Sequence, residues 1–580
     1  MRGRKRLTEN IEHLRLRLAS QRGAIVLAVL GLASGVIAGL VTVAFRALIE
    51  GLQALFVGTD FLQLSTQSRF IFPVCGAALT VALICFLGRG RLRTGVVHVL
   101  ERLSYNEGQL PFKNAVLQFF GGAIVLGAGL SMGREGPSIH LGATSGSQLG
   151  QWVRVPHNSL RTLVGCGVAA AIAASFNTPL AGVAFAMEVI LMEFTVASLT
   201  PVILAAVSGA TIGQLVYGSS TAFYVPPVSL HSLWELPYIV LMGIIIGFIA
   251  AAFIVLVRRL TRATRQFPWW LRMVAAGILT GACAMLVPHI MGVGYDSVNL
   301  VLTGSLAFAT LAAIVVFKIL ATSVCLAAGL PGGLIGPTLV IGAAAGGLLG
   351  YMGTSIAPVP ASDIGLYAML GMGAMMGATL QAPLAALLAL LELTGEMQIV
   401  MPGMLVVVSA SLAAKELFAC ESLFTVQMRE FGLDHSNDPV AQKLRGLGVT
   451  AAMSQDFRVT PSSIAATQAS VLLAGTPQWL VITTDDAKVL LPAADLARHL
   501  ESEQTGQIDL LDLPGRRRTL VGISPEATLQ AGLDLLAREE AEALYIEGPS
   551  EVHASGILGV LTPEQIDACY RYTPGVAPVG

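Results

Sequence analysis

Two short stretches, Gly133-Arg-Glu-Gly-Pro137 and Gly332-Gly-Leu-Ile-Gly-Pro337, decide the fold of this 580-residue chain. A proline fits the first turn of a helix, because its missing N–H would have no partner there in any case. Glycines just before the proline leave the neighbouring backbone N–H groups uncovered. Each stretch therefore predicts the start of a helix, whose N-terminus carries about half a positive charge and unpaired N–H donors.

The two stretches belong to a longer internal repeat. Three segments of the first half recur in the same order in the second half: Gly136-Pro-Ser-Ile-His-Leu-Gly-Ala as Gly336-Pro-Thr-Leu-Val-Ile-Gly-Ala, Gly165-Cys-Gly167 as Gly371-Met-Gly373, and Asn177-Thr-Pro-Leu-Ala-Gly as Gln381-Ala-Pro-Leu-Ala-Ala. Duplicated segments interrupted by Gly and Pro are typical of the binding site of a membrane transporter. Two such helix starts, directed at one place inside the membrane, would form an anion site that needs no lysine.

Composition indicates a lipid environment. Hydrophobic residues make up 54% of the chain and charged residues only 12%, whereas a soluble globular protein carries about twice that charged fraction. Several apolar segments between about residues 23 and 418 are too short to span a bilayer or are interrupted by Gly and Pro, which predicts discontinuous helices. We expect an all-α polytopic membrane protein with two structurally repeated halves and broken, tilted helices.

Charge and cysteine patterns restrict the other classes. The net charge of −1 gives no reason to expect a nucleic-acid partner, and the seven cysteines show no metal-ligand spacing, so we predict no metal site and no cofactor. The first 22 residues are rich in arginine and precede an apolar stretch from Gly23 to Phe45, which places the N-terminus in the cytoplasm. We expect a basic segment at 1–22 and a membrane domain at 23–432, with repeats at about 23–220 and 235–430.

The sequence changes character after about Gly432. Charged and amide residues return, and two sets of elements alternate: strands at Trp479-Leu-Val-Ile-Thr and Lys488-Val-Leu-Leu with a helix from Ala493, then strands at Ala543-Leu-Tyr-Ile and Gly556-Ile-Leu-Gly-Val-Leu with a helix after Thr562. Threonine is a good N-cap, and Pro563 suits the first helical position. Residues 433–580 are therefore expected to form a small soluble α/β domain of two similar halves, which resembles a pair of CBS motifs.

The membrane part resembles one family closely. Gly133-Arg-Glu-Gly-Pro137, together with Gly-Leu-Ile-Gly-Pro337 in place of Gly-x-Phe-x-Pro, is similar to the motifs of the CLC family of chloride channels and chloride/proton exchangers, many of which carry a paired CBS domain. The resemblance covers nearly the whole chain. It implies transport of chloride or a similar small anion, a homodimer, no enzymatic activity, and a multi-pass location in a bacterial inner membrane with both termini cytoplasmic.

The resemblance also implies the site residues. Backbone groups of the two stretches would line the anion sites: Gly133, Arg134, Glu135, Gly136, Leu334, Ile335 and Gly336. Glu135 would be the gating glutamate, whose carboxylate occupies an anion site as a tethered competitor and leaves when it is protonated or displaced. The alternative is that Glu135 only pairs with Arg134 or caps a helix. An ionisable residue at membrane depth favours the functional role.

Three positions depart from the family pattern. Thr94, in Arg93–Val97, aligns with the serine of the first selectivity motif, and Phe424 aligns with the pore tyrosine. Val189 stands at the proton-transfer position, where coupled exchangers usually have glutamate. Valine cannot carry a proton, so we predict a gated, passive anion channel, voltage-gated as in the family. A chloride/proton or fluoride/proton exchanger is the alternative, because some exchangers manage without that glutamate; a third hypothesis is a non-conducting membrane sensor with the CBS domain as its output.

Four further polar residues lie in apolar segments. We expect Glu188 to be a hydrogen-bonded structural carboxylate, and His140 to hydrogen-bond a neighbouring helix rather than to sense pH. Glu392 and Lys318 should pair with other polar groups inside the protein.

In the C-terminal domain, Asp495 and Gln565 stand where adenine-nucleotide-binding CBS motifs place an aspartate that meets the ribose. The resemblance therefore supports a hypothesis of nucleotide binding. A structural or dimer-stabilising role is the alternative.

Overall fold

The computed structural model describes residues 24–56, 58, 61–88, 93–219, 223, 230–356, 362–433, 439–484, 487–502, 506–548 and 556–569. The predicted basic segment 1–22 lies outside the described residues. Two compact units make up the chain: a helical unit, Ala24–Val153 with Leu160–His435, and a second unit formed chiefly by Ser436–Gly580.

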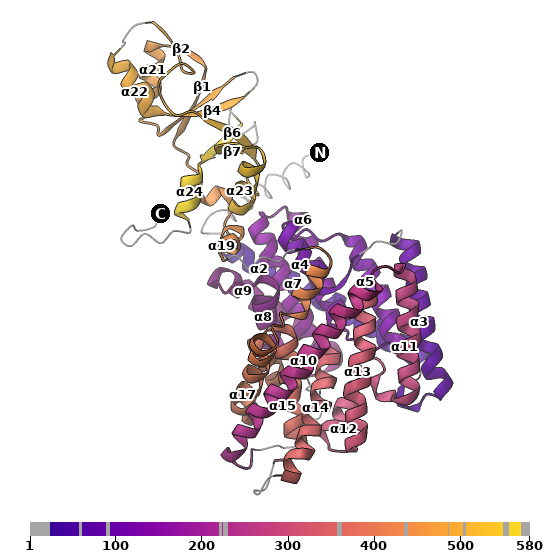
Figure 1. Ribbon diagram of the computed structural model, residues 1–580. Coiled ribbons are helices and arrows are strands. Elements are labelled where there is room, and N and C mark those ends of the chain that lie inside the picture. The colour runs from indigo at the N-terminus through magenta and orange to yellow at the C-terminus, as the bar shows by residue number, and fades with distance from the viewer. Residues whose placement is uncertain are drawn as a thin grey trace. The chain divides into compact units, whose positions relative to one another are not determined.

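The helical unit contains two similar series of helices (Figure 1). The first series is α2 (Ala24–Phe56), α3 (Thr66–Gly88), α4 (Gly95–Tyr105), α5 (Phe112–Gly127), α6 (Glu135–Val153), α7 (His157–Phe176), α8 (Pro179–Phe185) with the π-helical turn η3 (Ala186–Leu191), and α9 (Val196–Tyr217). The second series is α10 (Leu236–Thr264), α11 (Trp269–Leu286), α12 (Tyr295–Leu302), α13 (Phe308–Ala328), α14 (Ile335–Ile356), α15 (Ile364–Leu380), α16 (Pro383–Thr394), α17 (Val400–Leu412) with the π-helical turn η7 (Ala413–Leu417), and α18 (Leu423–Glu430).

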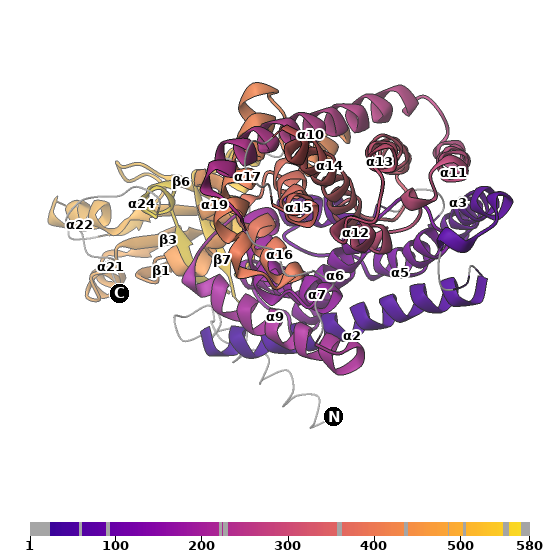
Figure 2. The ribbon, with the colours of Figure 1, turned by 90° about the horizontal axis from the view of Figure 1, so that it is seen from below.

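Helices too short to span a bilayer interrupt the series of long ones, as predicted. Within the described ranges, nine helices are long and apolar enough to cross a membrane, and between them lie short helices such as α4, α8, α12 and α16. Helix α7 is buried along nearly its whole length, whereas α2 and α3 expose most of theirs. In Figure 2, α11, α13 and α3 stand in a row at one edge of the unit. Since α2 and α3 expose apolar residues, the unit presents an apolar face to its surroundings.

Backbone geometry confirms the internal repeat. Gly129 and Gly329 both have φ of 78° and lie at corresponding points before α6 and α14; Asn177 and Gln381, with φ of 60° and 54°, lie just before α8 and α16. These are left-handed conformations, which end a helix and turn the chain. The same turns therefore break both halves.

Close crossings of small residues pack the repeated helices together. A Cβ added at Gly142 of α6 would meet the carbonyl of Gly167 of α7, and one added at Gly342 of α14 would meet the carbonyl of Gly371 of α15. Small residues at such crossings let membrane helices approach closely. In these crossings Gly371 corresponds to Gly167. The sequence analysis aligns Gly371 with Gly165 instead, so that alignment is shifted along α15.

Two glutamates cap each other's helices across the repeat. The Glu188 carboxylate, from η3, accepts hydrogen bonds from the N–H groups of Leu384 at 3.2 Å and Ala385 at 2.7 Å, in the first turn of α16. The Glu392 carboxylate, from α16, accepts from Leu180 at 2.9 Å and Ala181 at 2.8 Å, in the first turn of α8. Carboxylates stabilise helix N-termini by pairing their free donors. The predictions that Glu188 is a hydrogen-bonded carboxylate and that Glu392 pairs internally are both confirmed.

We predict that Glu188→Ala and Glu392→Ala each lower the unfolding temperature of the purified protein by a few degrees, because a lost cap costs about 1 kcal/mol. Glu188→Gln should cost less, since its amide oxygen still accepts one hydrogen bond. Thermal scans in detergent measure the effect, with the exposed Glu416→Ala as control. An unfolding temperature for Glu188→Ala equal to that of the control would contradict the capping role.

The second unit contains α19 (Pro439–Gly446), α20 (Val449–Ala452) and a six-stranded sheet in the order β1-β3-β4-β6-β7-β8. Its elements are β1 (Phe457–Pro461), α21 (Ala466–Leu473), β3 (Trp479–Thr483), β4 (Lys488–Pro492), α22 (Ala493–Ser502), β6 (Arg518–Ile523), α23 (Leu529–Arg538), β7 (Ala543–Glu547), β8 (Ile557–Leu561) and α24 (Pro563–Ala568), with a separate β2 (Ser463–Ala465) and β5 (Gln507–Asp509) pair. Strand β1 runs parallel to β3 and antiparallel β4 follows; β6, β7 and β8 repeat that pattern. The predicted strands, helices and two-fold repetition are confirmed.

Candidate functional site

The two glycine-proline stretches meet as a short antiparallel backbone bridge. Gly133 N–H donates to the carbonyl of Gly333 at 2.8 Å, and Gly333 N–H donates back to the carbonyl of Gly133 at 2.8 Å. Directly after the bridge, α6 begins at Glu135 and α14 at Ile335. The structure therefore brings both predicted helix starts to one place. The sequence analysis includes Gly133 among the anion-binding residues. In the structure, the Gly133 N–H is used in this bridge and is not free to bind an anion.

The side chain of Glu135 lies on the opposing helix start. Its Oε2 accepts a hydrogen bond from the backbone N–H of Gly336 at 3.0 Å, and its Oε1 accepts one from the hydroxyl of Tyr295. Glu135 is only 1% exposed. A carboxylate therefore occupies the place where the α14 N-terminus would bind an anion.

A buried glutamine holds the surrounding loops. Gln118, on α5, accepts from Gly95 N–H at 2.8 Å through its Oε1 and donates to the carbonyl of Pro331 at 3.0 Å through its Nε2. Gly95 follows Thr94, the N-cap residue of α4, and Pro331 precedes Gly332. The loop at Thr94 and the second glycine-proline stretch are thus tied to the same side chain.

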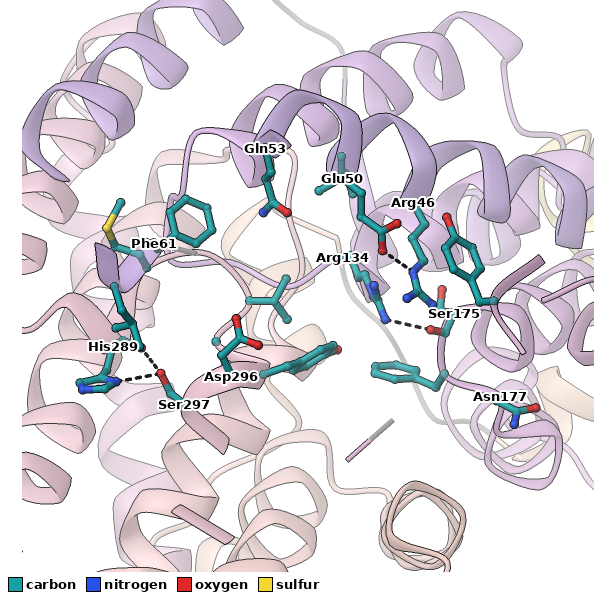
Figure 3. Close-up of a pocket in the computed structure, with 18 of the residues that line it drawn as sticks. Arg46, Glu50, Gln53, Phe61, Arg134, Ser175, Asn177, His289, Asp296 and Ser297 are labelled. Carbon is teal, nitrogen blue, oxygen red and sulfur yellow. Dashed lines mark hydrogen bonds and ion pairs between the residues drawn. The ribbon is translucent and has the colours of Figure 1, made fainter. Parts of the chain in front are cut away.

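Residues of the first glycine-proline stretch line two cavities. The first, the Thr94 cavity, has a volume of about 210 Å³ and is lined by five predicted residues, Thr94, Gly136, Leu334, Ile335 and Phe424, together with Arg93 and Arg272 among others. The second, the Arg134 cavity, has a volume of about 410 Å³ and includes Arg134 and Tyr295 (Figure 3). In the chain, Glu135 lies between Arg134, which lines one cavity, and Gly136, which lines the other. Its carboxylate accepts hydrogen bonds from Tyr295, which lines the Arg134 cavity, and from the N–H of Gly336.

Charged side chains line the Arg134 cavity. The Arg134 Nη2 donates to the carbonyl of Ser175 at 3.0 Å, and Arg46 of α2 pairs with Glu50 at 2.6 Å (Figure 3). The Arg134 guanidinium lies 5.2 Å from the ring centroid of Tyr295. Arg134 thus contributes its charge to this cavity and, through its carbonyl oxygen, accepts the first α6 hydrogen bond from Ser138 N–H at 3.0 Å.

Lys318, on α13, is fully buried beside the site. Its Nζ donates to the carbonyls of Ile290 at 2.9 Å, Gly292 at 2.8 Å and Val293 at 3.4 Å. These three residues form the loop that leads into α12. The prediction that Lys318 pairs with polar groups inside the protein is confirmed, and those groups are backbone carbonyls.

The remaining predicted positions lie on η3, α6 and α18. Val189 is buried in η3, next to the capping Glu188. His140 of α6 shares a 2.9 Å hydrogen bond between its Nε2 and Nδ1 of His98, on α4, so its predicted bond to a neighbouring helix is confirmed. Phe424, on α18, is buried and lines the Thr94 cavity.

Sequence reasoning missed Tyr295 and Gln118. A usable signal exists for Tyr295, because Gly292-Val-Gly294 before it predicts a turn into a helix N-terminus, as in the two glycine-proline stretches. Gln118 carries no local signal: it is one polar residue in an apolar helix, and only the packing of α5 shows what it holds.

The fold and the site define a CLC-type anion transport protein. A family model described as "Voltage gated chloride channel" matches residues 82–415, which is more than half of the chain. The chain belongs to this family, the CLC family, and is a multi-pass membrane protein.

Relatives and solved structures agree. A ClcB-like protein of Ralstonia nicotianae, named as a chloride channel protein, is 31% identical over 405 residues, covering 67% of this chain and 93% of the relative. The H(+)/Cl(-) exchange transporter ClcA of Salmonella arizonae is 28% identical over 424 residues, covering 69% and 88%. The crystal structure of a eukaryotic CLC transporter matches with a TM-score of 0.61 at 18% identity, covering 93% of this chain and 97% of that one, which shows the shared fold.

The backbone bridge makes a test of the site geometry. A Cβ at Gly136 would lie 2.7 Å from Cα of Gly333 and 3.1 Å from the carbonyl oxygen of Gly332. These are backbone atoms and cannot rotate away, so we predict that Gly136→Ala separates the two helix starts and abolishes anion flux into liposomes. Gly51→Ala on α2 is the control, because nothing lies within 4 Å of its added Cβ. Flux through Gly136→Ala at the level of Gly51→Ala would contradict the requirement for close backbone contact.

Proposed function

We propose that this protein conducts chloride, or a similar small inorganic anion, through a pathway that Glu135 closes. The observation that carries the proposal is the Glu135 carboxylate on the backbone N–H of Gly336, at the start of α14. A carboxylate and a halide compete for the same donors. In the arrangement described, the tethered anion holds the site; when it leaves, a free anion takes its place.

The anion-binding groups in this proposal are backbone amides. Those of Arg134, Glu135, Gly136, Leu334, Ile335 and Gly336 belong to the first turns of α6 and α14 or lie just before them, and Thr94 and Phe424 line the approach from the Thr94 cavity. Helix starts offer partial charges. Partial charges suit transport, since conduction requires binding that is weak enough for the ion to leave.

Passive conduction is the transport mode we propose. Val189 has no group that can accept a proton, and the adjacent Glu188 carboxylate is engaged by two helix N–H groups. A chloride/proton or fluoride/proton exchanger is the second candidate, and the exchange transporter ClcA among the relatives favours it. Purified protein in liposomes distinguishes the two: a chloride gradient drives current in both, but only the exchanger takes up protons against their gradient.

Glu135→Gln is predicted to raise chloride flux and to flatten its dependence on pH. The glutamine side chain has no negative charge to compete with chloride and no proton to gain. Chloride efflux from liposomes between about pH 4.5 and 7.5, a window that begins near the ordinary pKa of a glutamic acid side chain and extends to neutral pH, measures both effects. Unchanged flux in folded Glu135→Gln protein would contradict the gating role.

Val189→Glu alone is predicted to leave proton movement uncoupled from chloride. Phe424 and the segment around Thr94 would still differ from the exchanger pattern, and a single carboxylate does not rebuild a pathway. Proton uptake driven by a chloride gradient is the measurement. Stoichiometric proton transport in this variant would show that the one position decides the mode.

The C-terminal unit is proposed to be a CBS pair, and the protein a homodimer in a bacterial inner membrane with both termini in the cytoplasm. The repeated strand pattern of 433–580 supports the first of these. Gln565 accepts a hydrogen bond from Thr562 N–H at 2.8 Å, at the start of its own helix, and Asp495 lies 3.4 Å from Nη1 of Arg498. Both side chains thus have local partners, which favours the structural role of the domain over adenine-nucleotide binding.

A further inference from the structure

Tyr295 is the first residue of α12, and its hydroxyl reaches the gating carboxylate. The ring is fixed from two sides: it meets the ring of Phe223 edge-on at 5.4 Å and 86°, and the ring of Phe176 lies 6.0 Å away. Aromatic pairs in these arrangements stabilise each other beyond their buried area. The ring contacts therefore hold the Tyr295 hydroxyl at a defined position. The Glu135 side chain, which has more rotatable bonds, reaches that hydroxyl and accepts its hydrogen bond.

The loop before Tyr295 is itself anchored. Lys318, on α13, binds the carbonyls of Ile290, Gly292 and Val293, and Gly294 takes a left-handed φ of 87° directly before the helix starts. A lysine with its ammonium on three carbonyls restricts all of them at once. The backbone that carries Tyr295 is consequently tied to the long helix α13.

The Glu135 carboxylate accepts two hydrogen bonds, one from the Gly336 N–H and one from the Tyr295 hydroxyl, and an incoming anion can take over only the first. The N–H of Gly336 can pass from the carboxylate to an incoming anion, because both are acceptors. The Tyr295 hydroxyl on Oε1 adds a second bond, and hydrogen bonds to ionised groups are about twice as strong as those between neutral groups. When the carboxylate leaves, its hydrogen bond with the Tyr295 hydroxyl is lost. An anion that binds the Gly336 N–H does not replace that bond.

We propose that Tyr295 is a positioning residue that latches the ionised Glu135 side chain in the anion site and so sets the pH at which the pathway opens. The inference rests on the proposed gating role of Glu135. Charged and titratable groups also face this place. Arg134 lies over the Tyr295 ring, Lys318 binds the loop before Tyr295, and the Arg134 cavity adds Arg46, Glu50, His289 and Asp296. If the Tyr295 hydroxyl is the latch, removing that oxygen changes the pH dependence of flux even though all these charged groups remain.

Tyr295→Phe is the test, because it removes one oxygen atom and keeps the ring contacts. Chloride efflux from liposomes is measured from about pH 4.5 to 7.5, a window that begins near the ordinary pKa of a glutamic acid side chain and extends to neutral pH. We expect flux at neutral pH to rise about tenfold, and the pH of half-maximal flux to move upward by about one unit, since a hydrogen bond to a charged group is worth at least that factor. The sign follows because less acid is needed to release a carboxylate with one bond fewer.

Tyr351→Phe is the matched control. Its hydroxyl, on α14, donates to the carbonyl of Leu306 at 3.0 Å, away from the two glycine-proline stretches. This variant should keep the pH profile of the parent protein. Tyr295→Phe added to Glu135→Gln should change flux by less than about twofold, because no ionised carboxylate is left to latch.

The outcomes separate the latch from the gate. If Glu135→Gln leaves flux unchanged, the proposed gating function fails; if Glu135→Gln raises flux but folded Tyr295→Phe has the pH profile of Tyr351→Phe, the latch alone is overturned. Should Tyr295→Phe not fold, Phe223→Leu loosens the ring and is expected to move the pH profile in the same direction by a smaller amount. A Phe223→Leu profile equal to that of the parent would then overturn the proposal.

Discussion

The pair of hydrogen bonds between Gly133 and Gly333 is the interaction on which the helical unit depends. Backbone that leaves a helix inside a membrane must find partners within the protein, because lipid offers none. Here the two non-helical stretches supply each other's partners, and both helices begin immediately afterwards. These reciprocal hydrogen bonds bring two positive helix ends together and leave neither the N–H nor the carbonyl of Gly133 and Gly333 unpaired. Only glycine permits it, since a Cβ on Gly136 or Gly333 would collide with the opposite backbone.

The same reciprocity extends through the two halves. Glu188 caps α16 and Glu392 caps α8, so each half supplies the charge that the other half's broken helix lacks. The crossings at Gly142 and Gly342 repeat one packing solution in both halves. A single half would leave the first-turn N–H groups of its own broken helix, α8 or α16, without a carboxylate partner. The duplication is therefore a structural requirement as well as a way of making two helix starts.

Charge inside this unit is satisfied mainly by backbone. Lys318 binds three carbonyls, Arg134 binds the Ser175 carbonyl, and Glu135 binds the Gly336 amide. Burying a charge is expensive unless it is hydrogen-bonded. Backbone partners meet that requirement without a fixed countercharge. The Glu135 carboxylate also accepts a hydrogen bond from the Tyr295 hydroxyl. Both of its donors are neutral, so its departure leaves no unpaired countercharge behind.

The sequence by itself determined the class of fold, the repeat and the strands of the second unit, and it singled out Glu135 as a candidate residue. These follow from local signals: Gly-Pro helix starts, apolar length, and an ionisable residue between glycines. It also led to Thr94 and Phe424, which the structure places on one cavity with Gly136 and Leu334. It did not show that the Gly133 amide pairs with Gly333, because a bridging amide looks the same in sequence as a free one.

Only the tertiary structure decided which groups meet. Tyr295 lies 160 positions from Glu135, Gln118 lies 213 positions from Pro331, and the two glutamate caps join segments that are apart in the chain by similar distances. No periodicity or motif encodes such contacts, because they arise when the two halves pack and the side chains of one reach the helix ends of the other. Local sequence specifies where a helix starts; the fold specifies what stands in front of it.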